Sequence, residues 1–98
     1  QVEVIPNPFI VHSEFENDQY SLKLMITGLS EDCIIKIFTV TGELVSEWRH
    51  SDPSRGFDYW NLRNQNNQEV APGLYLFTIE DLTDNGNEPY VGKFVIIR

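Results

Sequence analysis

Few residues of this chain have types and spacings that could support chemistry. His12 and His50 stand 38 positions apart in segments expected to be loops, and no nucleophile motif or carboxylate lies at a telling spacing from either. We therefore predict that both are surface histidines. Cys33 is the single cysteine and lies in the apolar run CIIKIF, which favours a buried, unpaired thiol over a nucleophile. No catalytic set is predicted, so we expect the chain not to be an enzyme.

A cluster of oxygen-bearing side chains in the segment DLTDNGNE could hold a cation. Carboxylate and amide oxygens are the ligands that calcium prefers. The segment lacks the alternating D-x-D-x-D-G order and the distant glutamate of a calcium loop, so a plain hairpin centred on Asn85 and Gly86 is favoured. We predict no metal and no cofactor. The oxygen-bearing residues are Asp81, Asp84, Asn85, Asn87 and Glu88.

Four aromatic residues, Trp48, Tyr59, Trp60 and Tyr90, could form a flat platform on which sugar rings stack. Packing in the core is favoured for Trp60. Trp48 lies in VSEWRH, where flanking charges indicate a more open position near a strand end. A carbohydrate-binding module therefore remains a minor alternative.

Size and charge narrow the class of protein. The chain has 98 residues, 41% of them apolar, with 15 acidic and 7 basic side chains and a net charge of −8. This length suits a single domain over residues 1–98 with one modest core. The negative charge repels phosphate backbones and anionic lipids, so no nucleic acid is predicted as a partner. Apolar runs reach about four residues, against roughly 20 for a membrane span, so no membrane insertion is predicted.

Short strands must position these residues, because apolar and polar side chains alternate with a period of two. Residues 2–5 read as an edge strand that Pro6 and Pro8 end, since proline cannot donate to a sheet ladder. In YSLKLMITGL, Leu22, Leu24 and Ile26 share one face. The run 33–48 predicts two antiparallel strands joined by a hairpin at Gly42, which can adopt a positive φ.

The second half of the chain continues the pattern. Trp60 and Leu62 share a face, and RNQNNQE predicts a hairpin connection in which Asn66 and Asn67 tolerate left-handed backbone. The run GLYLFTIE predicts a strand that places the side chains of Tyr75, Phe77 and Ile79 together on one side. Residues 90–98 predict a last strand, and no helical period persists over three turns.

About seven short strands in 98 residues predict an all-β fold, an immunoglobulin-like antiparallel sandwich of two packed sheets. A five-stranded barrel is the competing architecture. In the sandwich, Pro72 and Gly73 end a crossover between the sheets. Tyr75 then stands where a tyrosine corner is expected, with its ring buried and its hydroxyl bonded to backbone a few residues upstream.

The order of these motifs resembles the small immunoglobulin-like domains of the flagellar hook-capping protein and of the C-termini of many secreted Bacteroidetes proteins. The resemblance spans nearly the whole chain. It rests on Pro6-Asn7-Pro8 near the start, Gly42 in a mid-chain hairpin, Gly73-x-Tyr75, and Lys93 opening the last strand. The chain departs from the hook-capping type at Trp60-Asn61-Leu62, where that type usually has Trp-Asp-Gly.

The resemblance implies a non-catalytic C-terminal domain of a longer protein, exported across the outer membrane and acting as a type IX secretion sorting or anchoring signal. Its implied partners are the secretion or anchoring machinery and the upstream domains of the same chain. Lys93 and Arg98 flank the last strand, so they and that strand's free backbone groups are the expected docking contacts. The alternative is a structural or adhesive module that packs on neighbouring domains or on copies of itself.

Overall fold

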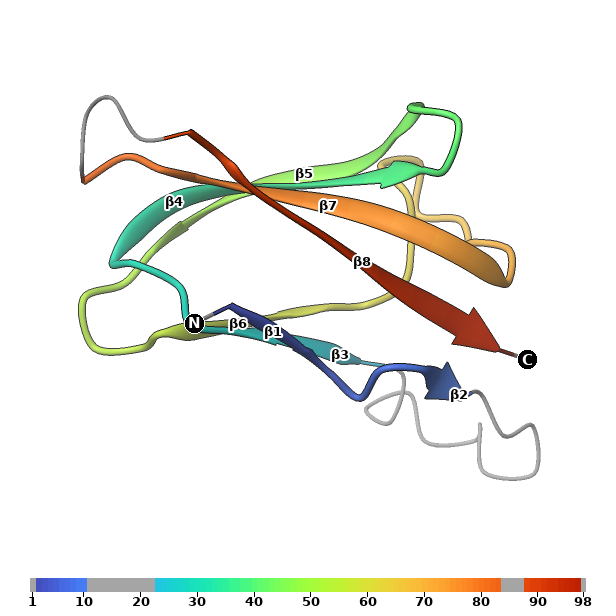
Figure 1. Cartoon of the computed structure of the whole chain (residues 1–98), viewed down its shortest axis with the longest axis horizontal. Coiled ribbons are helices and arrows are strands. Elements are labelled where there is room, and N and C mark those ends of the chain that lie inside the picture. The colour runs from blue at the N-terminus through green and yellow to red at the C-terminus, as the bar shows by residue number, and fades with distance from the viewer. Residues whose placement is uncertain (1, 11–22, 84–87, 98) are drawn as a thin grey trace.

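The structure of the protein is a computed structural model that describes residues 2–10, 23–83 and 88–97. Within these ranges the chain forms eight strands and no helix that is long and apolar enough to cross a membrane (Figure 1). The strands are β1 (Glu3–Ile5), β2 (Phe9–Ile10), β3 (Leu24–Thr27), β4 (Asp32–Thr39), β5 (Leu44–Ser51), β6 (Phe57–Trp60), β7 (Gly73–Asp81) and β8 (Tyr90–Ile97).

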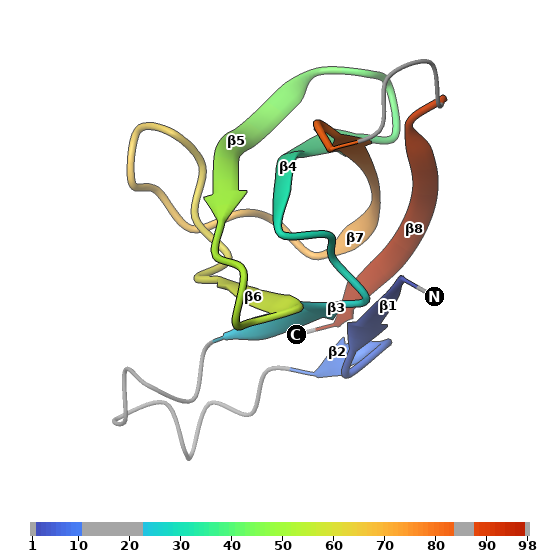
Figure 2. The same ribbon diagram turned by 90° about the vertical axis from the view of Figure 1, so that its left-hand side faces the viewer.

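The strands form two sheets packed face to face, which confirms the predicted sandwich and contradicts the five-stranded barrel. One sheet has the order β1-β3-β6 and the other the order β2-β8-β7-β4-β5. Figure 2 shows the larger sheet curving over the smaller one, with β8 coming down beside β1. Neighbouring strands are antiparallel except β2 and β8, which pair in parallel.

The core lies between the sheets, because each strand turns every second side chain inward. Leu24 and Ile26 are fully buried on β3, and Tyr75, Phe77 and Ile79 are buried on β7, as predicted. Leu22, expected on the same face as Leu24, lies outside the described residues. The buried apolar side chains are Phe9, Leu24, Ile26, Leu29, Cys33, Ile35, Ile37, Val45, Trp60, Leu62, Val70, Tyr75, Phe77, Ile79, Phe94 and Ile96.

The hairpin predicted at Gly42 joins β4 and β5, which pair antiparallel along their length. The Thr39 amide donates to the Glu43 carbonyl, and the Gly42 amide donates to the Thr39 carbonyl, both at 2.9 Å. Gly42 has a φ of 96°, a region that glycine enters without the steric cost of a Cβ. The turn therefore needs a glycine at this position.

The Pro6-Asn7-Pro8 segment carries the chain from one sheet to the other. Before it, β1 forms the predicted edge strand beside β3, and after it, β2 pairs with the end of β8. The Ile5–Pro6 and Asn7–Pro8 peptide bonds are both cis. The sequence did not predict β2, because two residues are too short to show a period.

The connection from β6 to β7 also follows the prediction. Trp60 and Leu62 are both buried, although β6 ends at Trp60. A turn closes where the Asn67 amide donates to the Asn64 carbonyl at 2.9 Å, and Asn67 has a left-handed φ of 62°. The Asn85–Gly86 hairpin lies outside the described residues.

Candidate functional site

Asn7 attaches the crossover segment to β8, the strand that carries the predicted docking residue. The Val95 amide donates to Asn7 Oδ1 at 3.2 Å, and Asn7 Nδ2 lies 3.5 Å from the Lys93 carbonyl oxygen. The side-chain amide of Asn7 therefore takes a position that a neighbouring strand would otherwise fill. This gives the Pro-Asn-Pro motif a physical role, because the prolines direct the chain and the asparagine binds it to the sheet edge.

Lys93 lies on this edge with an exposed side chain. Among residues 2–10, 23–83 and 88–97, no carboxylate forms an ion pair with it. The described arginines differ, since Arg49, Arg55 and Arg63 each lie within 4 Å of an acidic side chain. Arg98, the other docking candidate, lies outside the described residues. Lys93 is thus a cation on a strand edge without an acidic partner in the described chain.

The tyrosine corner is present and holds the start of β7. The Tyr75 hydroxyl donates to the Ala71 carbonyl, four residues upstream, and the ring is buried. Around it, Trp60 and Phe94 form an aromatic cluster with centroid separations of 5.8 to 6.4 Å. The indole Nε1 of Trp60 donates to the Arg63 carbonyl at 3.0 Å. Trp60 and Tyr75 therefore serve the fold, and Gly73 begins β7 with a positive φ of 141°.

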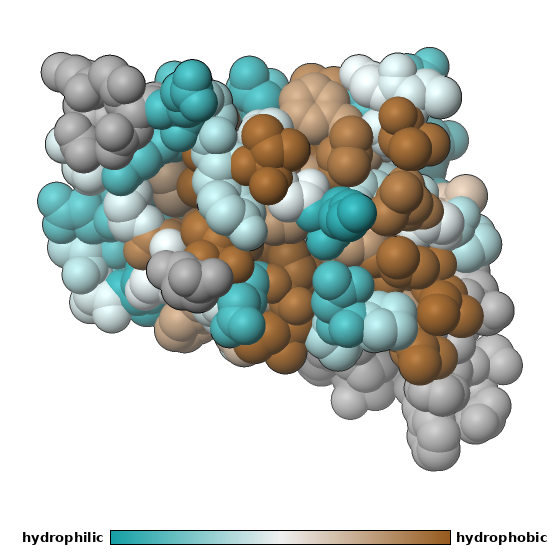
Figure 3. Space-filling model, in the orientation of Figure 1, coloured by the Kyte–Doolittle hydropathy of each residue, from teal (hydrophilic) through white to brown (hydrophobic). Residues whose placement is uncertain are grey.

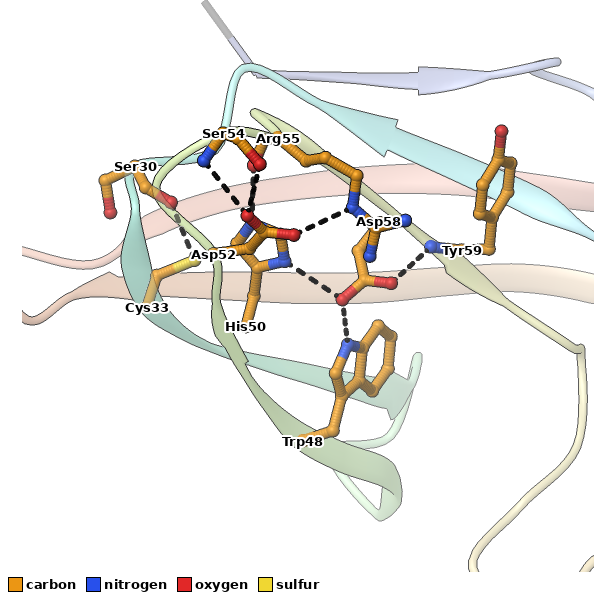
Figure 4. A network of polar contacts seen from close by, with 9 residues as sticks. All are labelled: Ser30, Cys33, Trp48, His50, Asp52, Ser54, Arg55, Asp58 and Tyr59. Carbon is orange, nitrogen blue, oxygen red and sulfur yellow. Dashed lines mark hydrogen bonds and ion pairs between the residues drawn. The ribbon is translucent and has the colours of Figure 1, made fainter.

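A polar network joins the sheets on the side opposite β8, between β5 and β6 (Figure 4). Asp58 Oδ2 accepts from Trp48 Nε1 at 3.2 Å and lies 3.1 Å from Nδ1 of His50. The other ring nitrogen of His50, Nε2, donates to the Arg55 carbonyl at 2.8 Å. Each ring nitrogen thus faces an oxygen, and the contact with Asp58 is an ion pair when the imidazole is protonated.

The prediction that His50 is a surface residue is wrong, because only 2% of it is exposed. The segment from His50 onward was expected to be a loop, but β5 continues to Ser51 and turns His50 inward beside Trp48. Trp48 likewise lies within the strand, partly buried against the core, and not at a strand end. His12 lies outside the described residues, so its surface position stays a prediction.

Partly buried carboxylates near this network have their own cationic or hydroxyl partners. Arg49 donates to both carboxylate oxygens of Asp32 at 2.7 and 2.8 Å, and this lowers the pKa of Asp32. The backbone and hydroxyl of Ser54, together with Arg55, lower the pKa of Asp52 in the same way. These contacts stabilise the carboxylate forms and provide no proton donor near neutral pH.

The structure brings together three of the four aromatic residues proposed as a sugar platform. Trp48, Tyr59 and Trp60 line one shallow hollow, but Trp60 is only 3% exposed and the Lys23 ammonium lies 5.6 Å from the centroid of the Tyr59 ring. Tyr90 lies on β8, which β7 and β4 separate from the β5 strand that carries Trp48. The four rings therefore do not form a single platform.

The remaining candidates for chemistry have structural surroundings. Cys33 is fully buried and unpaired, as predicted, and burial raises the pKa of its thiol. In the described ranges, no three acidic, histidine or cysteine side chains cluster so as to hold a metal ion. Three residues of the segment considered for calcium binding, Asp84, Asn85 and Asn87, lie outside those ranges. The carboxylate of Asp81, from the same segment, accepts hydrogen bonds from the amide and hydroxyl of Thr83.

Comparison with known proteins finds a structural similarity between this chain and part of a secretion component. No protein-family model and no curated protein matches it. Among solved structures, it is similar to part of PorZ of Porphyromonas gingivalis, described as an essential bacterial surface component of the type IX secretion system. The two are 27% identical with a TM-score of 0.73, and the match covers 99% of this chain but 11% of the PorZ chain. The chain is therefore similar, over its whole length, to one part of a type IX secretion component.

Proposed function

We propose that this chain is a non-catalytic accessory domain of a secreted or cell-surface protein, recognised by the type IX secretion machinery as a sorting or anchoring signal. The observation that carries the proposal is the similarity of the whole chain to part of PorZ. Its partners are the machinery and the upstream domains of the same protein. Its location is the cell surface or the medium, reached across the outer membrane.

Two features of the molecule support this role. The match to 11% of PorZ fits a unit that occurs as a module within a longer protein. Among the described residues, two candidates for catalysis are used in the fold, since His50 bonds Asp58 and the Arg55 carbonyl, and Cys33 is buried. Both features support recognition through the surface as the activity of the domain.

The test is a reporter with residues 1–98 fused to its C-terminus, expressed with a periplasmic signal peptide in a type IX-competent bacterium. We expect the reporter outside the outer membrane, on the cells or in the medium. The matched control is the reporter fused to an unrelated β-sandwich of similar size, which should stay in the periplasm. Periplasmic retention of both fusions would contradict the sorting role. Incubation with common hydrolase substrates should give no turnover.

A second function, a structural or adhesive module, is favoured by apolar side chains on the outside of the molecule. Figure 3 shows them gathered on the right of the view, where β2, the end of β8 and the start of β7 lie. A contiguous apolar surface of this kind is typical of contact with another protein surface. Concentration-dependent association of the domain in analytical ultracentrifugation would favour this function over sorting. The exposed residues there include Ile10, Leu74 and Ile97.

A further inference from the structure

β8 has a free edge over its first half, since the Asn7 side chain contacts the Lys93 carbonyl and the Val95 amide farther along the strand. On one side it pairs with β7 from Tyr90 to Ile96, whereas on the other side β2 covers only Ile96 and Ile97. In the described part of the chain, no strand pairs with the outer edge of residues 90–95. Figures 1 and 2 show this stretch crossing the front of the molecule and curving toward β1. An uncovered edge is a template for pairing with another strand.

The register fixes which backbone groups face outward. The Val95 amide and the Lys93 carbonyl both contact the Asn7 side chain, so they point away from β7. Along a strand, alternate residues direct their amides and carbonyls to the same side. The Val91 amide and carbonyl and the Lys93 amide therefore lie at the free edge, the Lys93 carbonyl contacts Asn7, and Gly92 and Phe94 bond to β7.

A hollow of about 350 Å³ lies beside this edge, between β8 and β1. Residues 2–4, including the carboxylate of Glu3, line one side, and Gly92 and Lys93 line the other, with Asn7, Phe77 and Tyr90 completing the lining. A strand added to β8 would turn alternate side chains into this hollow and onto the outer face, where Val91 is 64% exposed. Most of the exposed lining is polar, so the hollow favours small or polar side chains at every second position of the added strand.

Charge decides which strand fits. The cation of Lys93 has no acidic partner among the described residues, so a carboxylate opposite it on the added strand would form a cross-strand pair. A second copy of this chain fits worse, because pairing of two β8 edges in the register that sets Lys93 opposite Lys93 brings two like charges together. The net charge of this chain does not exclude a carboxylate of the partner next to Lys93. At physiological salt, charges more than about 8 Å from that carboxylate are largely screened.

We propose that the free edge of β8 at Val91 and Lys93 accepts an extended strand of the type IX machinery, with small or polar side chains in the hollow beside Gly92 and a carboxylate facing Lys93. This inference rests on the proposed function and names the contact through which it acts. Pairing of an extended segment with a sheet edge is an established mode of recognition, in which backbone bonds supply affinity and alternate side chains supply specificity.

The first test is amide hydrogen exchange on the isolated chain, followed by NMR. The Val91 and Lys93 amides should exchange rapidly, and the Gly92 and Phe94 amides, which bond to β7, should exchange slowly. Slow exchange at Val91 and Lys93 in a monomer would show that another segment of the same chain covers the edge. That result would overturn the proposal without touching the proposed function.

The second test uses the reporter fusion with Val91→Pro, which removes one donor at the free edge and leaves the β7 ladder intact. Val91→Thr is the matched control, because it keeps the amide and nearly the same shape. Thermal unfolding must first show that both variants fold. We expect export to fall about tenfold or more for Val91→Pro and to stay unchanged for Val91→Thr. Equal export of the two folded variants would refute the edge contact while the exported wild type still supported sorting.

Substitutions of Lys93 distinguish an acidic partner from two other possibilities, namely that Lys93 only prevents pairing between copies and that a second copy occupies the edge. If Lys93 faces a carboxylate, the reversed charge should reduce export, and Lys93→Arg should restore it. If Lys93 only prevents pairing between copies, Lys93→Met should form dimers in sedimentation and leave export unchanged, which would overturn the proposal. A wild-type dimer that Val91→Pro dissociates would identify a second copy as the occupant and would likewise overturn it.

Discussion

Replacing Gly92 by alanine should destabilise the domain, because the inner face of β8 has no room for a methyl group. A Cβ at this position would lie 2.4 Å from Cζ and 2.6 Å from Cε1 of Phe77, far inside the usual carbon contact of about 3.5 to 4.0 Å. Phe77 is buried and packs at 6.0 Å, centroid to centroid, from both Tyr90 and Phe94. Its ring therefore cannot move aside without disturbing two others.

Overpacking of this kind costs about 1 to 3 kcal/mol. For a domain of this size each kcal/mol lowers Tm by about 4 to 8 °C, so Gly92→Ala should lower Tm by roughly 5 to 20 °C. The assay is thermal unfolding at neutral pH, followed by circular dichroism. Gly56→Ala is the matched control, because its Cβ would meet only the Leu29 carbonyl oxygen at 3.4 Å. That control should be neutral or stabilising, since alanine restricts the unfolded chain.

A double-mutant cycle identifies the cause. Phe77→Leu alone should destabilise the core, but in the Gly92→Ala background it should relieve the clash, giving a coupling energy of about 1 kcal/mol or more. An unchanged Tm for Gly92→Ala, or strictly additive effects of the two changes, would refute this account of the packing between β7 and β8.

Three further predictions concern stability and reactivity. Tyr75→Phe removes the hydroxyl bond to Ala71 and should cost about 1 kcal/mol in chemical denaturation; no change would refute a stabilising tyrosine corner. Because Arg49 lowers the pKa of Asp32 below its unfolded value of 3.8, the stability this pair supplies is present above that pH and is lost as pH falls through the folded pKa. Arg49→Met should therefore move the acid unfolding midpoint to higher pH, with an unshifted midpoint as the contrary result. The Cys33 thiol should resist Ellman's reagent in the native state and react on unfolding, whereas prompt native reaction would contradict its burial.

The sequence predicted the features that depend on local signals. Alternation identified the buried side of β7, glycine identified the turn at Gly42, and the Pro-Gly-x-Tyr order identified the corner at Tyr75. Each of these follows from residues close together in the chain, where propensity and period act directly. The resemblance to known surface domains drew on the same local marks.

The features it missed depend on contacts between distant segments. His50 was predicted at the surface because polar residues surround it, but Asp58, on the opposite sheet, supplies its partner. The pairing of β2 with β8 joins residues more than eighty positions apart, and the free edge of β8 exists only because β2 is so short. The burial of a side chain such as His50 and the exposure of a strand edge such as that of β8 depend on how the sheets assemble. Neither produces a periodic pattern in the sequence.

The most direct measurement of the central claim is the fraction of reporter accessible to added protease on intact cells. It is compared between a type IX-competent strain and its derivative lacking a functional type IX apparatus, both expressing the reporter joined to residues 1–98. The account predicts an accessible reporter in the competent strain alone. Equal accessibility in the two strains would contradict it.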